Sequence, residues 1–323
     1  MLRSISIKAF EIIVTLLLST IVIFVLVHLA PGDPVETLYG RVIEVAVGDK
    51  QEYDEDIEEI RNSLGLNDSL TVQYFRWLKR LAQFNMGQSI RTGRPVTAEI
   101  MEKLPATALL AVTALLIQIA LGLVFGILSA IKAGKAQDNI IRFICVLFAS
   151  VPGFVIGLVL LMIFAVSLNA YVIGGGVGVK QIWLPALTLA LGLAPQSIRV
   201  VRASLLTEFG QTYILASRAR GLSRQLILKS ALKNSAIPII TLLSLSLAAL
   251  LGGSVVIENV FAWPGIGKYA LDSILAHDYP VIQGYAFIMV FMVIALNLLV
   301  EIIYLLIDPR LRRKKGGSAN ENA

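Results

Sequence analysis

Six uncharged apolar runs dominate this 323-residue sequence and restrict what the chain can fold into. None of them contains Asp, Glu, Lys or Arg, and they cover residues 12–30, 104–131, 143–168, 181–198, 234–257 and 279–300. An α-helix needs about 20 apolar residues to cross a bilayer core of about 30 Å, where charge is costly. Because 56% of the residues are hydrophobic and only 15% are charged, the sequence predicts an all-α membrane protein with six transmembrane helices.

The first and fourth runs differ from the others. The first follows a basic N-terminus, as a signal peptide would, but it is too long for the apolar part of one, so we expect a retained helix. The fourth would form only about 27 Å of helix. Pro185 and Pro195 are expected to interrupt it, which makes it the weakest of the predicted spans.

The distribution of positive charge predicts the orientation in the membrane. With the N-terminus inside, the cytoplasmic segments carry 17 Lys and Arg residues, whereas the two short external loops carry only Lys180 and Lys268. Basic residues of short loops remain on the cytoplasmic side. Both termini are therefore expected to be cytoplasmic, and residues 31–103 to be extracytoplasmic.

Two amphipathic helices are predicted within this extracytoplasmic segment, at "YDEDIEEIRNSLGL" (53–66) and "SLTVQYFRWLKRLAQF" (69–84). Their expected apolar faces are Ile57, Ile60 and Leu64 in the first, and Val72, Phe75, Leu78 and Leu81 in the second. The chain then divides into the first span with its cytoplasmic end (1–30), a helical extracytoplasmic insertion (31–103), a five-helix core (104–308) with a cytoplasmic region at 199–233, and a basic cytoplasmic tail (309–323).

The sequence contains no recognisable energy source. The stretches "GGGVGVKQ" (174–181) and "PGIGKYA" (264–270) do not fit the phosphate-loop pattern. None of the six runs has an ionisable group near its middle, where an ion-coupled carrier would need one, and His28 lies near the outer end of the first run. No catalytic constellation is present, and His28 and His277 lie far apart with no ligand partners at metal-site spacing. We therefore expect a conduit with no catalytic residue, metal or bound cofactor of its own. A secondary, ion-driven carrier is the rival class.

The basic stretch between the fourth and fifth runs is the strongest candidate for a functional element. Helical periodicity approaches Gly221 from both sides, through Leu205, Phe209, Tyr213 and Ala216 upstream and Leu226, Ile227 and Ala231 downstream. Gly221 suits the end of the first helix and Ser223 can cap the second. A loop lying on anionic headgroups would explain the charge equally well. The internal periodicity favours a folded surface for a protein partner.

These residues resemble the dipeptide, oligopeptide and nickel permeases of ATP-binding-cassette importers. In that branch the stretch typically reads Y-x-x-x-A-R-A-x-G-L … A-L-R-N, and this chain has Tyr213, "SRARGL" (217–222) and "ALKN" (231–234). Leu215 and Ser217 depart from the general importer motif, E-A-A-x-x-x-G. The similarity continues through "APGDP" (30–34), "MGQSIRTGRPVTAEIMEKLPAT" (86–107), "WLPALTLALG" (183–192) and "VIENVFAWPGIGKYA" (256–270).

The resemblance implies a type I importer permease fold in a bacterial or archaeal cell membrane. It implies a second, similar permease, two cytosolic ATPases that bind ATP and Mg²⁺, and an extracytoplasmic solute-binding protein, with no nucleic-acid partner. The stretch would contain the coupling helix that docks on an ATPase. The residues carried over are Tyr213, Ala216, Ser217, Arg218, Ala219, Arg220, Gly221 and Leu222.

Two points stay open at this stage. The segment Ala262, Trp263, Pro264, Gly265 and Ile266 is either a packed turn or a lining of the outer mouth near the binding protein. The cargo is expected to be di- or oligopeptides by a narrow margin, with nickel or a metal chelate as the alternative. The loop "NAYVIGGGVGVKQIW" (169–183) lacks the L-P-x-S-G turn that is frequent in the family, so the resemblance implies least about the structure and role of this loop.

Overall fold

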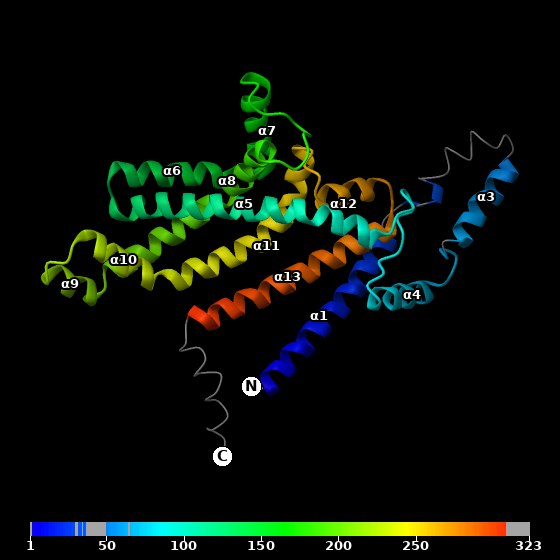
Figure 1. Ribbon diagram of the computed structural model, residues 1–323, viewed down its shortest axis with the longest axis horizontal. Coiled ribbons are helices and arrows are strands. Elements are labelled where there is room, and N and C mark those ends of the chain that lie inside the picture. The colour runs from blue at the N-terminus through cyan, green and yellow to red at the C-terminus, as the bar shows by residue number, and fades with distance from the viewer. Residues whose placement is uncertain (1, 30–31, 34, 37–49, 64, 308–323) are drawn as a thin grey trace, which may run out of the picture. The chain divides into compact units, whose positions relative to one another are not determined.

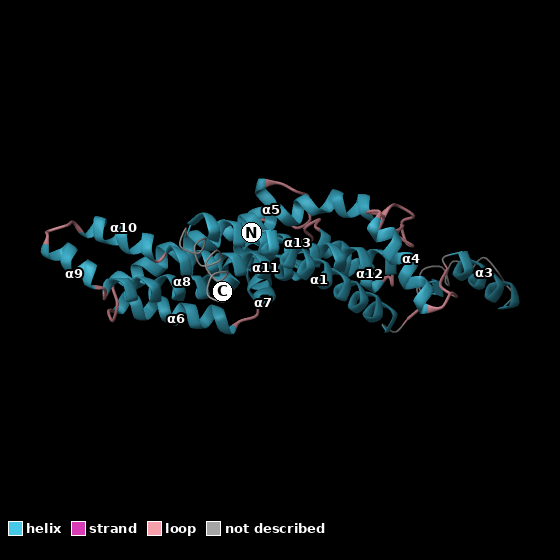
Figure 2. Cartoon of the chain, turned by 90° about the horizontal axis from the view of Figure 1, so that it is seen from below, coloured by secondary structure: helices cyan, strands magenta, loops and turns pink. Residues whose placement is uncertain are grey.

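The computed structural model describes residues 2–29, 32–33, 35–36, 50–63 and 65–307, and this part of the chain is helical without a named strand (Figures 1 and 2). Two compact units are present, residues 1–105 with 265–295 and residues 106–264 with 296–323. The helices are α1 (Leu2–Leu29), α3 (Lys50–Ser63), α4 (Leu70–Ala82), α5 (Val96–Ile131), α6 (Ala136–Ser150), α7 (Gly153–Leu161), the π-helix η1 (Met162–Ser167), α8 (Val179–Phe209), α9 (Thr212–Ala219), α10 (Arg224–Asn234), α11 (Ala236–Val260), α12 (Ile266–Leu275) and α13 (Tyr279–Ile307).

The predicted membrane fold is confirmed. The helices α1, α5, α8, α11 and α13 are each long and apolar enough to cross a bilayer, and α6 with α7 and η1 adds a sixth candidate if this bent pair forms one span. The helical insertion after the first span is present as α3 and α4. The tail 309–323 and most of "APGDP" lie outside the described residues.

The third span differs from the straight helix expected over residues 143–168. Its first half, α6, begins at Ala136, and the chain bends by 99° before α7 (Figure 1). The break falls at Val151 and Pro152, which have extended backbone angles (ψ 129° and 138°). Proline disfavours helical angles in the residue before it and lacks an N–H of its own, so the helix stops at Ser150.

The expectation that proline interrupts the fourth span is wrong. Helix α8 continues through Pro185 and Pro195 for 31 residues and packs against α6, α7, α10 and α11. Pro185 has no N–H for the carbonyl of Gln181 four residues earlier, but the hydroxyl of Tyr171 donates to that carbonyl at 2.9 Å. Burial raises the pKa of Tyr171 to about 12, so the hydroxyl remains a donor. This external donor satisfies the carbonyl group that proline leaves unpaired.

Removing the Tyr171 hydroxyl should therefore matter only while Pro185 is present. We expect Tyr171→Phe to lower the thermal stability of the purified protein, because an unsatisfied buried carbonyl costs about 1–3 kcal/mol. In a Pro185→Ala background the helix supplies its own N–H to Gln181, and the same Tyr171→Phe change should cost much less. Equal losses in the two backgrounds, measured by thermal unfolding, would show that the hydrogen bond does not compensate for the proline.

In the unit formed by residues 1–105 and 265–295, α4 buries only part of the face that was predicted. Leu81 is buried and Leu78 is half-buried, whereas Val72 and Phe75 are 47% and 61% exposed, and Trp77 is buried in their place. Trp77 packs beside Phe24 of α1, with ring centroids 6.2 Å apart, in the core cluster of this unit. The large aromatic side chain, rather than the strict apolar period, therefore sets the orientation of the helix.

Two buried carboxylates hold the loop between α4 and α5 in the same unit. Asp278 is fully buried and accepts hydrogen bonds from the Ser89 hydroxyl (2.6 Å) and the Ile90 N–H (3.2 Å). Glu99 accepts a hydrogen bond from the hydroxyl of Tyr269 in α12. Burial, with this contact to Glu99, raises the pKa of Tyr269. The Thr92 hydroxyl also donates to Glu99 at 3.3 Å, so the loop is held by Asp278 and by Glu99 at the start of α5.

Candidate functional site

The predicted helix–glycine–helix element is present at α9 and α10. Helix α9 ends at Ala219, and Gly221 follows with a left-handed φ of +75°. The turn is closed by the N–H of Leu222, which donates to the carbonyl of Ser217 at 3.1 Å. Ser223 then caps α10 by accepting from the N–H of Leu226. Glycine occupies the one position of this turn with a positive φ, where it has no steric cost.

The upstream helix is shorter than the periodicity predicted. The run from Leu205 to Ala216 is two helices, because α8 ends at Phe209 and Gln211 is extended (φ −77°, ψ 148°) before α9 begins. Tyr213 bridges this break: its hydroxyl donates to Glu208 of α8 at 2.5 Å. Burial and this carboxylate raise the pKa of Tyr213.

One face of the helix pair is anchored in the core. Ile214 of α9 and Ile227 and Ala231 of α10 are buried together in one apolar cluster. Its other buried members are Ala130 of α5 and Val201 and Leu205 of α8. The pair is therefore a packed extension of the α5 and α8 ends, not a loose loop, and movement of its surface would be transmitted to these two helices.

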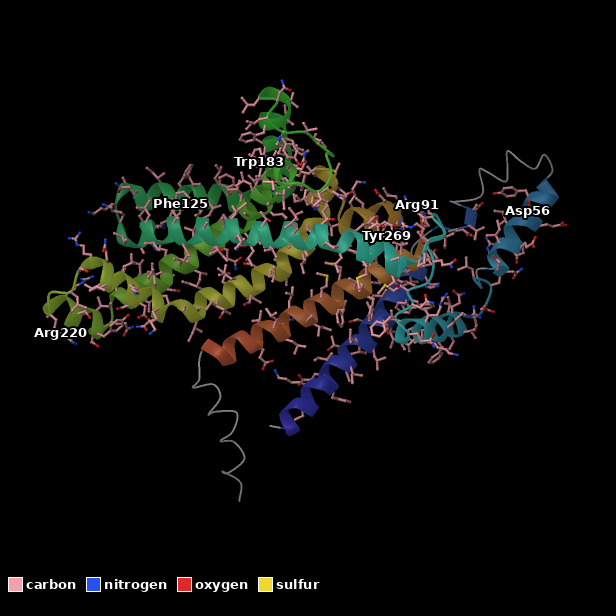
Figure 3. All side chains as sticks on the ribbon, in the orientation of Figure 1. Asp56, Arg91, Phe125, Trp183, Arg220 and Tyr269 are labelled. Atoms are coloured by element: carbon pink, nitrogen blue, oxygen red, sulfur yellow. The ribbon has the colours of Figure 1, made fainter. Side chains whose placement is uncertain are left out.

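The opposite face is exposed and both apolar and basic. Leu215, Leu222 and Leu226 are 57%, 38% and 52% exposed. Arg218, Arg220 and Arg224 are exposed around them, and Arg220 lies at the tip of the turn (Figure 3). Exposed leucines next to arginines are typical of a protein contact surface. We call this face the coupling surface.

The eight residues predicted for coupling lie together in this element. Tyr213 and Ser217 are half-buried, and the Ser217 hydroxyl donates to the Tyr213 carbonyl at 2.7 Å. Both therefore hold the fold of α9. The remaining six are exposed: Ala216, Arg218, Ala219, Arg220, Gly221 and Leu222.

A buried ion pair beneath the coupling surface was not predicted from the sequence. Asp138, at the start of α6, is fully buried and accepts two hydrogen bonds of 2.8 Å from the guanidinium of Arg202 in α8. It also accepts from the Ser129 hydroxyl and from the N–H of Gly134. Ser129 precedes Ala130 in the sequence and Arg202 follows Val201, and both Ala130 and Val201 belong to the anchoring cluster. The ion pair therefore adjoins this cluster on α5 and α8. In the sequence, Arg202 is only one of the basic residues that predict the orientation in the membrane.

A second buried carboxylate lies near the end of α11. Glu258 is fully buried and accepts a hydrogen bond from the hydroxyl of Thr107 at 2.7 Å. The predicted span ends one residue earlier, at Ile257, so this acid lies just outside the uncharged run. Among the residues that the structure describes, no group of three or more His, Cys, Asp or Glu side chains has a geometry for a metal ion.

The segment predicted for the outer mouth is largely buried. Trp263 is 2% exposed and its Nε1 donates to the carbonyl of Ala106 at 3.0 Å, while Ala262 is half-buried with a φ of +50°. In the other unit, Gly265 and Ile266 are buried. Only Pro264 is exposed. This burial favours the packed-turn interpretation for Trp263 and Ile266, and the role at the outer mouth stays a prediction.

The fold and the exposed helix pair define a membrane component of a transport system, and comparison with known families agrees. The model described as "Binding-protein-dependent transport system inner membrane component" matches residues 122–313, and "Binding-prot-dependent transport system membrane comp, N-term" matches residues 1–111. The chain belongs to this family. It is a multi-pass, non-catalytic permease subunit of an ATP-binding-cassette importer, a class whose systems include an ATPase and a binding protein.

Particular relatives narrow the comparison. The chain is 37% identical to the "Nickel import system permease protein NikB" of Staphylococcus aureus strain MRSA252 over 321 residues, which are 99% of this chain and 95% of that protein. The NikB protein of strain N315 is equally similar. Among solved structures, a chain of the inward-facing MetNI methionine ABC transporter aligns with a TM-score of 0.55 and 20% identity, covering 65% of this chain and 96% of that chain. At this identity the likeness concerns the fold alone.

Proposed function

We propose that this permease subunit forms part of the pathway for nickel or a nickel chelate. The observation that carries the proposal is the 37% identity to nickel import permeases along 99% of the chain. The sequence alone had favoured peptides by a narrow margin and kept nickel as the alternative. The similarity along nearly the whole chain supports the nickel alternative better than the peptide prediction.

The proposed mechanism uses ATP hydrolysed by other subunits. One of two cytosolic ATPases docks on the coupling surface, a second permease completes the pathway, and an extracytoplasmic binding protein delivers the cargo. Closure of the ATPases on ATP would displace α9 and α10. Because Ile214, Ile227 and Ala231 anchor the pair to the ends of α5 and α8, the displacement would reach the spans and switch the pathway from inward- to outward-facing. The coupling surface and both termini are cytoplasmic in this scheme.

Uptake by the reconstituted transporter tests the cargo and the energy source together. Proteoliposomes that contain both permeases and the ATPases, supplied with the binding protein, should accumulate radiolabelled Ni²⁺ or its chelate and not a labelled dipeptide. Uptake should require ATP on the side of the membrane that carries the ATPases, and it should survive an uncoupler. Dipeptide uptake without nickel uptake would reject the cargo. Uptake that stops with the uncoupler and ignores ATP would favour the ion-driven carrier.

The outer-mouth proposal is tested by thiol labelling. In a Cys145→Ala background, Pro264→Cys should react with a membrane-impermeant maleimide added from the extracytoplasmic side, because Pro264 is exposed. Ile266→Cys is the matched control and should stay unlabelled, since Ile266 is 1% exposed. Saturating binding protein should slow the labelling of Pro264→Cys. Labelling at 264 that the binding protein does not change would remove this segment from the contact.

A further inference from the structure

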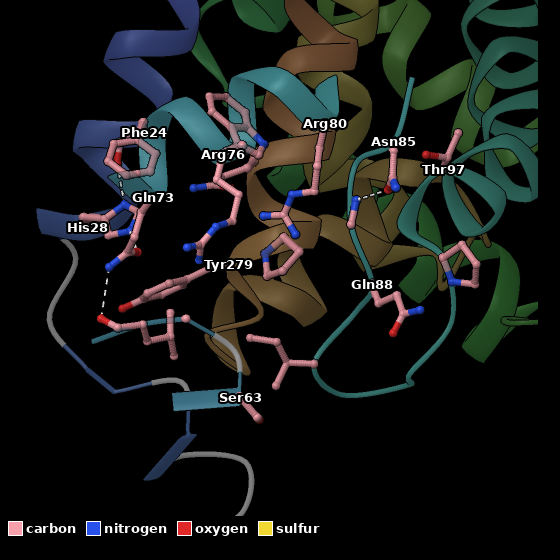
Figure 4. A pocket seen from close by; sticks show the side chains of 18 of the residues that line it. Phe24, His28, Ser63, Gln73, Arg76, Arg80, Asn85, Gln88, Thr97 and Tyr279 are labelled. Atoms are coloured by element: carbon pink, nitrogen blue, oxygen red, sulfur yellow. Dashed lines mark hydrogen bonds between the residues drawn. The ribbon is translucent and has the colours of Figure 1, made fainter. Parts of the chain in front are cut away.

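The unit formed by residues 1–105 and 265–295 contains a cavity of about 570 Å³ that the transport mechanism above does not use. Its walls come from α1, the end of α3 and the turn after it, α4, the loop after α4, and the starts of α5 and α13 (Figure 4). Two arginines one helical turn apart, Arg76 and Arg80, extend into it toward Tyr279 (Figure 4). No aspartate or glutamate is among the described residues that line it. Its charge is therefore positive.

Most polar groups in these walls already have protein partners. His28 contacts the Phe24 carbonyl (2.8 Å) and the Gln73 side-chain oxygen (3.2 Å). The amide of Gln73 donates to two main-chain carbonyls. The hydroxyl of Tyr279 donates to the Gly32 carbonyl at 2.9 Å. These side chains form the walls of the cavity and are not its free binding groups.

Two donors remain. Arg76 pairs with Asp68 at 2.6 Å, but the described residues offer no carboxylate to Arg80. Arg80 is exposed, but partial desolvation at the cavity wall and the charge of Arg76 lower the pKa of its guanidinium. Trp77 lines the same cavity, is 2% exposed, and has no acceptor for its Nε1 among the described residues. A buried N–H without an acceptor is costly, and a ligand oxygen would remove that cost.

The cavity also lies at the ends of two membrane spans. Phe24 and His28 belong to the last turns of the span Phe10–Leu29, and Tyr279 and Gln283 belong to the first turns of the span Tyr279–Glu301. Tyrosine side chains at span ends, such as Tyr279, are enriched at the level of the lipid headgroups. A volume in the range of small-molecule sites, two arginines and a free indole N–H at this depth fit an anionic oxygen group.

We propose that this cavity binds an oxyanion through Arg80 and the Trp77 indole, with Arg76 in support. Two sources share this chemistry, the phosphate of an anionic lipid headgroup and the carboxylate of a small solute. The site is separate from the coupling surface, and it does not depend on the identity of the transported cargo.

Two probes on the intact transporter test the site and distinguish its sources. Native mass spectrometry measures retention of phosphatidylglycerol against phosphatidylcholine. Titration with succinate, in nanodiscs of phosphatidylcholine only, measures carboxylate binding through the thermal shift of the complex. We expect Arg80→Gln to weaken binding of the active probe about tenfold, the effect of losing one charge-assisted hydrogen bond. Trp77→Phe keeps the ring and removes the N–H, and should weaken the same binding by about threefold.

Lys79→Gln is the matched control. Lys79 is the neighbour of Arg80 on α4, is exposed as Arg80 is and carries the same charge, but it does not line the cavity. It should leave both readouts unchanged, which separates the site from general attraction to basic surface. Arg80-dependent retention of phosphatidylglycerol assigns a lipid, and Arg80-dependent binding of succinate assigns a solute. Binding of neither probe by the unmodified transporter, or equal losses in Arg80→Gln and Lys79→Gln, would overturn the proposal.

Discussion

Gly221→Asp should abolish nickel uptake and substrate-stimulated ATP hydrolysis while the permease still inserts into the membrane. Gly221 is exposed at the turn of the coupling surface, and a β-carbon added there would meet no heavy atom of the described chain within 4 Å. Aspartate tolerates left-handed angles better than most residues. The side chain therefore fits this chain by itself, and it puts a negative charge where the ATPase is proposed to pack.

The size of the effect follows from the place of Gly221 in the turn between α9 and α10, beside Arg220 and Leu222. Disrupting an energetically dominant contact of an interface costs about 2 kcal/mol or more, equivalent to a loss of about 30-fold in binding of the ATPase. The measurements are ATP hydrolysis and uptake in proteoliposomes, with insertion followed by membrane extraction. If only docking is weakened, ATP hydrolysis and uptake should rise again when the ATPase concentration is raised.

Gly176→Asp is the control for backbone strain. Gly176 also has a positive φ (+83°), is exposed, and has open space around the position of a β-carbon, but it lies in the loop between η1 and α8, far along the chain from the coupling surface. It should retain uptake. Normal uptake by Gly221→Asp would contradict docking at this turn. Equal losses at both positions would point to strain rather than to a lost partner contact.

The membrane-spanning helices could be predicted from the sequence because the absence of a few residue types marks them. Charge is excluded from mid-bilayer, so runs without Asp, Glu, Lys or Arg mark the spans. The turn at Gly221 was equally accessible, since a left-handed angle between two helices requires glycine and Ser223 can cap only the helix that follows. In both cases the physical cause lies within a few residues of its effect, and one sequence therefore contains it.

The remaining features depend on contacts between distant residues. Pro152 breaks a helix and Pro185 does not, because Tyr171, ten residues before Gln181, satisfies the carbonyl that Pro185 leaves free. The buried face of α4 is set by the packing of Trp77 on Phe24. The sequence has no local signal for either partner. The cavity around Arg80 was missed for the same reason, since α1, α4 and α13 meet there only in the fold.

The buried pair of Asp138 and Arg202 gives the largest expected effect on stability. Asp138→Leu leaves the Arg202 guanidinium without its carboxylate and removes the acceptor for Gly134 and Ser129. Breaking one partner of a buried ion pair costs about 3–5 kcal/mol, whereas replacing both partners by apolar residues is often nearly neutral. We therefore expect Asp138→Leu to lower the free energy of unfolding by this amount, and Asp138→Leu with Arg202→Met to recover most of it.

Unfolding of the purified permease, followed by tryptophan fluorescence, measures both variants. Asp272→Asn is the matched control, because its pair with Lys268 has a similar length, 2.9 Å, but both side chains are more than a third exposed. An exposed pair contributes about 0–1 kcal/mol, so this change should be small. If Asp138→Leu were no worse than Asp272→Asn, the pair would not hold α6 to α8. If it is worse, substrate-stimulated ATP hydrolysis should be lost in the single variant and return in the double variant. That result would link the ion pair to the coupling surface, which packs on the same helices.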